Sequence, residues 1–396
     1  MGARRVSAVS VKPSPLRALL ARHQEALGGQ RLLIAGAPPE DLLRSDFPPT
    51  ATLTVLAERY SLWERLQGSP ETDARFSFSA RGDEEATTLL FFWPKAHEAA
   101  LFLLERALPG LAAGGRLLLI GENQGGVRRA PLLVAERFPA LFAEPPEQLD
   151  NARRARIYVA QPRAPLAAQP SLDGHWRRWT LPARGEAPAL TICSLPGVFA
   201  HGTLDSGSEL LLDALPAAGL SLAERALDFG CGAGVLGLSL LAQGLATRVD
   251  FADASALALR STEESLAANG LTERGELLPL SGARALLPAA ARRYRLIISN
   301  PPFHEGRQTS YGPSEGLFKA SPALLSIRGQ LLLVANRFLP YLEQLQGALG
   351  EHRVEVITED RRFRVYRGLG GSSPQRGMSG ARARRRRAGQ KGRGKR

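Results

Sequence analysis

The sequence predicts an α/β protein with two tandem domains of one architecture, followed by a basic tail. Two observations predict this fold class. Strand-like and helix-like segments alternate along both halves of the chain, and the second half repeats the pattern of the first. At 396 residues the chain is also long for a single hydrophobic core. We expect domains over residues 1–165 and 191–370, a linker over 166–190 and a tail over 371–396.

The first half contains apolar runs of strand length around one segment of helical periodicity. We predict strands over 31–36, 52–56, 87–92 and 116–121, and a helix over 96–108. Residues 161–189 are rich in proline and alanine, and we interpret them as an interdomain connection with room for some strand.

The second half restarts the alternation more clearly. We predict strands over 225–229, 247–251, 295–299 and 330–335, a hairpin formed by 354–357 and 363–367, and helices over 235–243 and 255–269. Gly270 follows the second of these helices and can end it in the left-handed conformation.

Composition excludes several classes of protein. The chain is 44% hydrophobic and 22% charged, without an apolar run of the roughly 18 residues that a membrane span needs. The basic N-terminus has no apolar signal segment, so we expect a cytoplasmic protein without a membrane partner. Two cysteines, Cys193 and Cys231, and six scattered histidines form neither a disulfide scaffold nor a zinc motif, so we expect no metal.

Positive charge is concentrated in the tail. The net charge is +13, of which residues 371–396 carry ten, so that the rest of the chain has a charge of +3. A segment of glycine, serine and arginine cannot bury a core, and we predict that it is disordered. We expect Arg382, Arg384 and Arg385 to attract phosphates without sequence preference; a tail that serves solubility alone is the alternative.

A glycine loop follows the first predicted strand of the second half. Asp228 is followed by Gly230, Cys231, Gly232 and Gly234, and a helix begins directly after them. Glycines permit positive φ and let the backbone approach a ligand closely. The spacing is tighter than the G-x-G-x-x-G of dinucleotide enzymes and suits a ligand without phosphates. We predict that these five residues bind a cofactor; a structural turn is the alternative.

An acidic residue ends the next predicted strand. Asp253 lies 23 residues after Gly230, close to the position at which nucleotide-binding folds place the acid that binds ribose. Asp250 is nearby, but Asp253 is closer to the end of the strand, so we prefer it. The alternative is a helix N-cap. Ser281, past the expected third strand, is a candidate adenine contact. Together these positions predict a cofactor that contains adenosine.

The motif Asn300-Pro301-Pro302-Phe303 follows an apolar strand and indicates the reaction. Proline at 301 keeps Asn300 out of the helical region, and two prolines stiffen the loop. Asn300 Oδ1 and the Pro301 carbonyl can accept both N–H bonds of a conjugated amine, which lets its nitrogen pyramidalise toward a methyl donor. Phe303 can stack on the base. We therefore predict transfer of a methyl group from S-adenosylmethionine to an exocyclic amine.

Two segments near this motif are weaker candidates. His304 and Glu305 follow it directly and can contact substrate, or they can form a solvated loop. Residues 204–209 precede the first strand of the second half and can close over the cofactor, which Asn300 also borders.

These motifs resemble the bacterial small-subunit ribosomal RNA guanine-N2 methyltransferase C family. The resemblance covers roughly residues 30 to 367. It includes Leu195-Pro196-Gly197-Val198-Phe199, Leu266-Ala267-Ala268-Asn269-Gly270, Asn300-Pro301-Pro302-Phe303-His304-Glu305-Gly306, Val334-Ala335-Asn336-Arg337-Phe338 and, in the first half, Trp93-Pro94-Lys95 and Gly121-Glu122-Asn123.

The resemblance implies two Rossmann-like class I methyltransferase domains, of which only the C-terminal one binds S-adenosylmethionine. It also implies a guanine of 16S ribosomal RNA as target, presented in the assembled 30S subunit, and we expect a monomer. Ser281 departs from the more polar adenine contact that we would expect, and the tail lies outside the family pattern.

The first half lacks the chemical residues of the second. Its loop at 36–39 has one glycine followed by Ala37-Pro38-Pro39, and Phe91-Phe92-Trp93-Pro94-Lys95 stands where an Asn-Pro-Pro motif would be. Our hypothesis is a degenerate duplicate retained for RNA recognition or for support of the catalytic domain.

The motif leaves other substrates open. Asn-Pro-Pro-aromatic motifs also serve adenine-N6 DNA methyltransferases and protein glutamine-N5 methyltransferases, since all these substrates present a planar conjugated amine. A guanine of 23S ribosomal RNA is a further alternative. A different class of function is a non-catalytic RNA-binding assembly factor on the same fold.

Overall fold

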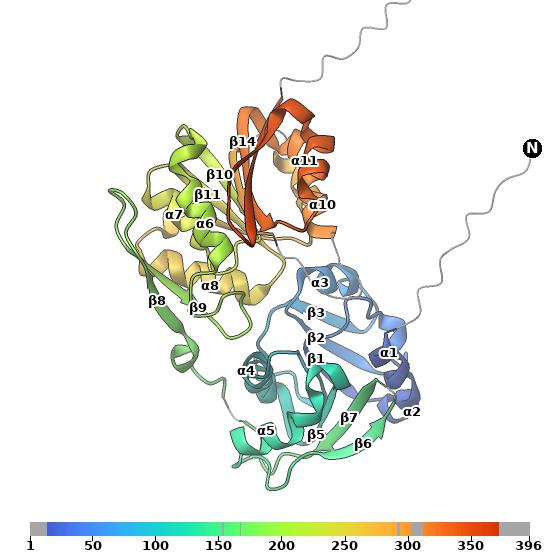
Figure 1. Cartoon of the computed structure of the whole chain (residues 1–396). Coiled ribbons are helices and arrows are strands. Elements are labelled where there is room, and N and C mark those ends of the chain that lie inside the picture. Colours follow the sequence, from blue (N-terminus) through green and yellow to red (C-terminus); the bar gives the residue numbers. More distant parts are fainter. Residues whose placement is uncertain (1–13, 153, 167, 291–293, 302–311, 372–396) are drawn as a thin grey trace, which may run out of the picture.

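The computed structural model describes residues 14–152, 154–166, 168–290, 294–301 and 312–371, and it confirms the two α/β domains (Figure 1). The described residues form two seven-stranded sheets, in the orders β3-β2-β1-β4-β5-β7-β6 and β12-β11-β10-β13-β14-β16-β15. In each sheet the first five strands are parallel, and the last two run antiparallel as a hairpin. The two halves therefore share one topology.

The N-terminal sheet consists of β1 (Arg31–Gly36), β2 (Thr52–Ala57), β3 (Thr72–Phe76), β4 (Ala86–Phe92), β5 (Leu111–Glu122), β6 (Glu147–Asn151) and β7 (Ala155–Ala160). Its helices are α1 (Pro15–Leu20), α2 (Gln24–Leu27), α3 (Tyr60–Leu66), α4 (His97–Ala107) and α5 (Ala130–Arg137). The predicted strands and the predicted helix of this half are confirmed, with shifts of a few residues at their ends.

The C-terminal sheet consists of β10 (Ala223–Phe229), β11 (Ala246–Asp253), β12 (Gly275–Pro279), β13 (Tyr294–Ser299), β14 (Leu325–Asn336), β15 (Val354–Glu359) and β16 (Phe363–Leu369). Its helices are α6 (Ser206–Ala214), α7 (Val235–Ala242), α8 (Ala256–Ala268), α9 (Leu287–Ala290), α10 (Gly312–Leu324) and α11 (Tyr341–Leu349). Gly270 follows α8 with φ +65°, as predicted.

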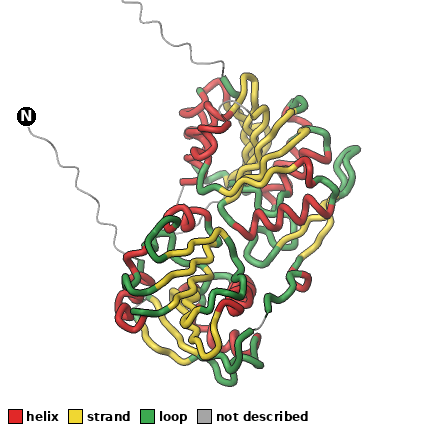
Figure 2. Tube along the Cα trace, turned by 180° about the vertical axis from the view of Figure 1, so that it is seen from behind, coloured by secondary structure: helices red, strands yellow, loops and turns green. Residues whose placement is uncertain are grey.

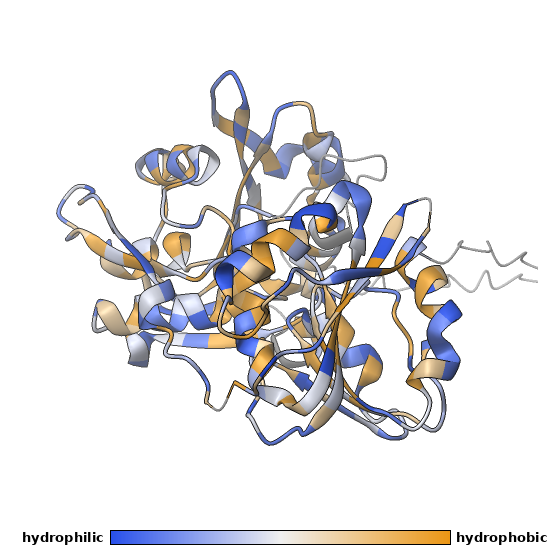
Figure 3. Cartoon of the chain, turned by 90° about the horizontal axis from the view of Figure 1, so that it is seen from below, coloured by the Kyte–Doolittle hydropathy of each residue, from blue (hydrophilic) through white to orange (hydrophobic). Residues whose placement is uncertain are grey.

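Helices cover both faces of each sheet (Figure 2), so the central strands are buried on both sides. Figure 3 shows hydrophobic residues gathered on the strands and on the inward sides of helices. In the part of the chain that the structure describes, no helix is long and apolar enough to cross a membrane.

The segment between the domains contains a short antiparallel pair, β8 (Arg177–Leu181) with β9 (Leu190–Ser194). The proline-rich connection thus carries a strand. One buried apolar cluster includes Phe102 of α4, Leu195 after β9 and Leu257 of α8. The two domains consequently pack against each other through the segment that joins them.

Candidate active site

The predicted glycine loop lies between the end of β10 and the start of α7. Gly230, Gly232 and Gly234 have φ values of +75°, +56° and +83°, in the left-handed region that favours glycine. A Cβ at position 234 would lie 2.5 Å from Leu238 Cδ1, whereas a Cβ at position 232 would meet no atom within 4 Å. Gly234 therefore leaves room for the Leu238 side chain in the first turn of α7, and the backbone at Gly232 borders open space.

Asp253 holds this loop from the end of the neighbouring strand. Its Oδ2 accepts a hydrogen bond from the backbone N–H of Gly232 at 3.0 Å, and its Oδ1 accepts one from Ser255 N at 2.9 Å. Burial raises the pKa of this carboxyl, while these hydrogen bonds and the positive charge of Arg59 act in the opposite direction. Each oxygen keeps a lone pair, so the carboxylate can still accept from the hydroxyl groups of a ribose.

The two alternatives for this acid do not hold. The N-cap of α8 is Ser255, whose Oγ accepts from Ala258 N at 3.1 Å, so Asp253 does not cap that helix. Asp250 is buried within the sheet, accepts the hydroxyl of Tyr294 at 2.6 Å and pairs with Arg225. Of the two acids, Asp253 is the one at the open edge.

Ser281 follows β12 at the same edge of the sheet. The N–H of Leu280 donates to the backbone carbonyl of Asp253 at 3.1 Å, which fixes the end of β12 beside β11. Ser281 is exposed one residue further on. This position agrees with the predicted adenine contact, and the role itself stays a prediction.

The side chains of Asp228, in β10, and Cys231, in the loop itself, are both buried. The Asp228 side chain is fully buried, and its Oδ2 accepts from Gly237 N at 2.8 Å, while Oδ1 has no partner among the described residues. Burial, with a smaller effect of the negative charge of Asp253, raises the pKa of Asp228 to about 7. Burial also raises the pKa of the Cys231 thiol well above its usual value, so this side chain is neutral.

Asn300 follows β13, directly beside the end of β10. Its Nδ2 donates to Asp205 Oδ2 at 2.8 Å and to Ser208 Oγ at 3.0 Å. A carboxylate can only accept, so the atom that faces Asp205 must be the amide nitrogen. Because both amide hydrogens are used in this way, Oδ1 is left as the acceptor available to a substrate. Pro301 is buried next to it.

Several predicted residues lie outside the described part of the chain. These are Pro302, Phe303, His304 and Glu305 of the motif, and Arg382, Arg384 and Arg385 of the tail.

The sequence did not identify the residues that orient Asn300. In the segment 204–209, which remains a candidate for closing over the cofactor, Asp205 is the N-cap of α6 and accepts from Ser208 N at 2.9 Å as well as from Asn300. Gly207 makes this approach feasible, since a Cβ there would lie 3.0 Å from Asp205 Oδ2. Sequence alone signals the helix cap, but it does not show which side chain the cap will meet.

These side chains stand at the ends of three adjacent strands, and no cluster of potential metal ligands is present in the described ranges. A sheet of this order, with a glycine loop, an acid and an anchored asparagine at one edge, defines a Rossmann-like methyltransferase domain. Residues 189–367 match the family model "Methyltransferase small domain", and residues 18–179 match "Methyltransferase small domain N-terminal".

Curated relatives narrow this class. The chain is 36% identical to the ribosomal RNA small subunit methyltransferase C of Klebsiella pneumoniae over 359 residues, covering 89% of this chain and 96% of the relative. It is 35% identical to that of Escherichia coli K12 over 361 residues, or 90% and 96% of the two chains. The chain therefore belongs to the ribosomal RNA small subunit methyltransferase C family, as its motifs predicted.

A solved structure shares the whole fold. The 16S rRNA N2 G1207 methyltransferase of T. thermophilus, in complex with AdoMet and guanosine, is similar with a TM-score of 0.73 and 23% identity, over 91% of this chain and 92% of that one. Both domains are thus found together in that protein.

Proposed function

We propose that the chain transfers the methyl group of S-adenosylmethionine to the exocyclic N2 of a guanine in 16S ribosomal RNA. The names of the curated relatives, and the AdoMet and guanosine in the T. thermophilus complex, support this substrate and this cofactor. The observation that carries the proposal is the anchored amide of Asn300, which leaves one oxygen to accept from an amine.

The residues at this edge fit the proposed cofactor. Asp253 can accept from the ribose hydroxyls, the backbone around Gly232 can lie against the ligand, and Ser281 borders the same edge. When bound, S-adenosylmethionine supplies an electrophilic methyl group on a positively charged sulfur. The Asp228 carboxyl is buried in β10, where a nearby positive charge would favour its ionised form.

Asn300 acts on the other reactant. The amino group of guanine is a poor nucleophile because its lone pair is delocalised into the ring. With its nitrogen side held by Asp205 and Ser208, the amide oxygen of Asn300 can accept one N–H of that amine and stabilise the positive charge that develops during transfer. Asp205 and Ser208 are positioning residues in this scheme, because they fix the direction in which Oδ1 faces.

A direct test offers purified full-length protein four substrates in parallel: 30S subunits, naked 16S ribosomal RNA, DNA and a release factor. We expect methylation of a guanine N2 in 30S subunits, read by mass spectrometry of nucleosides and by mapping modified guanines in cells with and without the gene. Methylation of DNA adenine or of protein glutamine alone would contradict the proposed substrate. Absence of S-adenosylmethionine binding at millimolar ligand would instead favour the non-catalytic assembly factor.

We also propose that the basic tail strengthens RNA association without sequence preference. Its ten positive charges would release counterions on binding, and this makes affinity fall with salt. Deletion of residues 371–396 should flatten the slope of log affinity against log salt and leave activity at low salt intact. An unchanged slope would indicate a tail that serves solubility alone.

A further inference from the structure

The two domains meet at equivalent loops. The segment after β2 enters α3, and the segment after β11 enters α8, and these two segments pair with each other antiparallel at Arg59 and Ser255. Tyr60 N donates to Ala254 O at 2.7 Å, and Ala256 N donates to Glu58 O at 2.9 Å. Figure 1 shows α3 on the side of the N-terminal domain that faces the C-terminal one. The contact is a local two-fold arrangement of duplicated parts.

This contact continues into the proposed cofactor site. The Glu58 carboxylate accepts the hydroxyl of Ser255, whose backbone N–H donates to Asp253 Oδ1 at 2.9 Å. The other oxygen, Asp253 Oδ2, accepts from Gly232 N at 3.0 Å. A continuous chain of contacts thus runs from the N-terminal domain through the acid at the end of β11 to the glycine loop.

The charged side chains at this contact act on one another electrostatically. Glu58 and Asp253 are two carboxylates on opposite sides of the interface, and burial raises the pKa of both. The positive charge of Arg59 acts against this rise in pKa at both carboxyls, so it favours the ionised form, which accepts hydrogen bonds. Arg59 is itself exposed and belongs to the N-terminal domain. The C-terminal domain therefore receives from the N-terminal domain a positive charge that acts on its own acid, Asp253.

We propose that the N-terminal domain completes the cofactor site, with Glu58 and Arg59 as positioning residues that hold Asp253 in its binding orientation. The proposal rests on the proposed role of Asp253 as acceptor of the ribose. If so, cofactor binding and packing of the two domains are thermodynamically coupled. Cofactor binding then strengthens the domain contact by the same factor by which the contact strengthens cofactor binding.

The test measures binding of S-adenosylmethionine to the full-length chain by calorimetry. We expect Arg59→Ala to weaken affinity about tenfold, and Arg59→Lys, which keeps the charge, to recover most of it. Glu58→Ala should weaken affinity about fivefold, whereas Glu58→Gln, which keeps an acceptor for Ser255, should stay within about twofold of the wild type. Arg65→Ala is the matched control and should leave the affinity unchanged, because Arg65 is an exposed arginine of α3, the helix that begins directly after Arg59.

A double-mutant cycle separates positioning from general loosening of the interface. In the Asp253→Ala background, Arg59→Ala should have less than about twofold further effect, because the group on which it acts is gone. Full additivity would overturn the proposal. Wild-type affinity in Arg59→Ala and Glu58→Ala, together with loss of affinity in Asp253→Ala, would overturn it while leaving the role of Asp253 intact. Wild-type affinity in Asp253→Ala would refute both.

Discussion

The two sheets have the same strand order, and their corresponding edges carry side chains of opposite character. When Gly36 is aligned with Gly230, the strand registers place Ile34 of the N-terminal domain where the C-terminal domain has Asp228, and Ala57 where it has Asp253. By the same registers Phe92 stands at the position of Asn300. The three N-terminal residues are buried and apolar. The N-terminal domain thus keeps the strand order of the C-terminal domain although it has apolar residues at the three positions compared.

The loop after the first strand also differs between the domains. In the C-terminal domain Gly230 N and Cys231 N both donate to Ala252 O on β11, at 2.8 and 3.1 Å. In the N-terminal domain Ala37 N donates instead to Phe92 O on β4 at 2.8 Å, and a Cβ at Gly36 would lie 2.2 Å from that oxygen. In the N-terminal domain this loop therefore packs against the end of β4, the position at which the C-terminal domain has Asn300.

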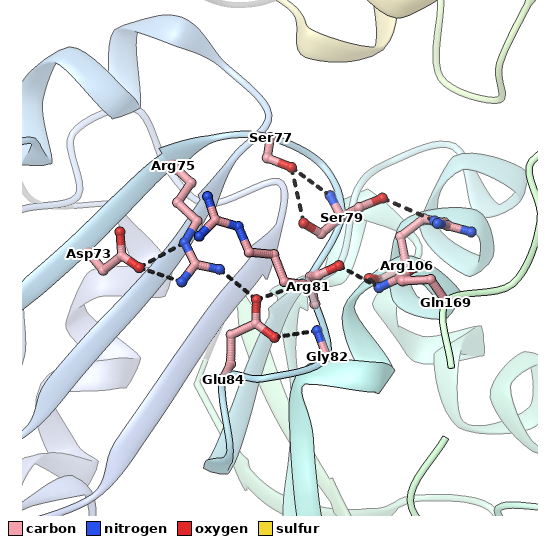
Figure 4. A network of polar contacts seen from close by, with 10 residues as sticks. Asp73, Arg75, Ser77, Ser79, Arg81, Gly82, Glu84, Arg106 and Gln169 are labelled. Carbon is pink, nitrogen blue, oxygen red and sulfur yellow. Dashed lines mark hydrogen bonds and ion pairs between the residues drawn. The ribbon is translucent and has the colours of Figure 1, made fainter. Parts of the chain in front are cut away.

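The loop after β3 occupies the corresponding edge of the sheet in the N-terminal domain. The loop after β3 is held by the buried Glu84 carboxylate, which accepts from Arg81 N at 2.7 Å, from Gly82 N at 2.8 Å and from Arg75 at 2.6 Å (Figure 4). Phe78, at the position of the exposed Ser281, packs against Phe102 with ring centroids 6.0 Å apart. The polar contacts at this edge stabilise the loop. We therefore expect only the C-terminal domain to bind cofactor and substrate at this edge of its sheet.

The largest effect is expected at Asn300. Asn300→Ala should lower kcat by about 10²–10³, the usual effect of losing one group that stabilises developing charge. The affinity for S-adenosylmethionine should stay nearly unchanged, since Asp253 and the glycine loop remain. Single-turnover methylation of 30S subunits and calorimetry measure the two quantities. Asn300→Asp should be as inactive, because its carboxylate cannot donate to Asp205. A variant that loses cofactor binding and turnover to the same degree would contradict the assigned role.

Asp253→Ala is expected to act on the other reactant. Loss of a charged acceptor for the ribose hydroxyls should weaken cofactor affinity by about 10–100-fold, from about 1.5–3 kcal/mol for hydrogen bonds to a charged group. Calorimetry of the wild type should also give one S-adenosylmethionine per chain, since Ala57 stands at the equivalent N-terminal position. Two sites per chain would refute the contrast between the domains.

Asp205→Ala tests whether the direction of the Asn300 amide matters. Without the carboxylate the amide can rotate, and we expect kcat to fall about tenfold with cofactor affinity unchanged. The loss of the α6 N-cap should cost about 1 kcal/mol of stability, visible as a lower Tm. Ser255→Ala removes the N-cap of α8 in the same way without touching Asn300, and it should keep kcat at saturating cofactor. Equal kcat losses in both variants would mean that stability alone is responsible.

Much of the fold and of the candidate site could be predicted from local sequence, because the central strands are apolar runs with polar residues at their ends. β1 and β13 are apolar runs buried on both faces, and their ends were predicted to within a residue. The edge strands β3 and β6 were not predicted, since they are largely exposed or half-buried and lack an apolar run. The sequence also placed Asp228, Asp253 and Asn300 at strand ends, which the sheet order brings side by side.

The supporting contacts could not be predicted in the same way. Asp205 and Asn300 are 95 residues apart, and Glu58 and Ser255 are 197 residues apart and lie in different domains. Such pairs depend on how finished elements pack, and no local pattern specifies them. The sequence can show that residue 205 begins a helix or that residue 58 follows a strand, but the partner across the fold comes from tertiary structure alone.

The smallest effect is expected for the stability of the protein when Asp228 is substituted. The N-terminal domain has an isoleucine at the equivalent position. Burial in the folded protein raises the pKa of Asp228 from its usual value of 3.8 to about 7, so ionisation of this group opposes folding. The stability that the protonated form supplies is complete below pH 3.8 and is lost as the pH rises through about 7. Asp228→Asn, which keeps an acceptor for Gly237 N, should therefore raise Tm at pH 8 and raise it less at pH 5. Asp360→Asn is the control: hydrogen bonds from Phe363 N and Arg362 N lower the pKa of that exposed carboxyl, so its effect should be the same at both values. A Tm difference for Asp228→Asn that does not depend on pH would mean that this carboxyl is already paired in the folded protein.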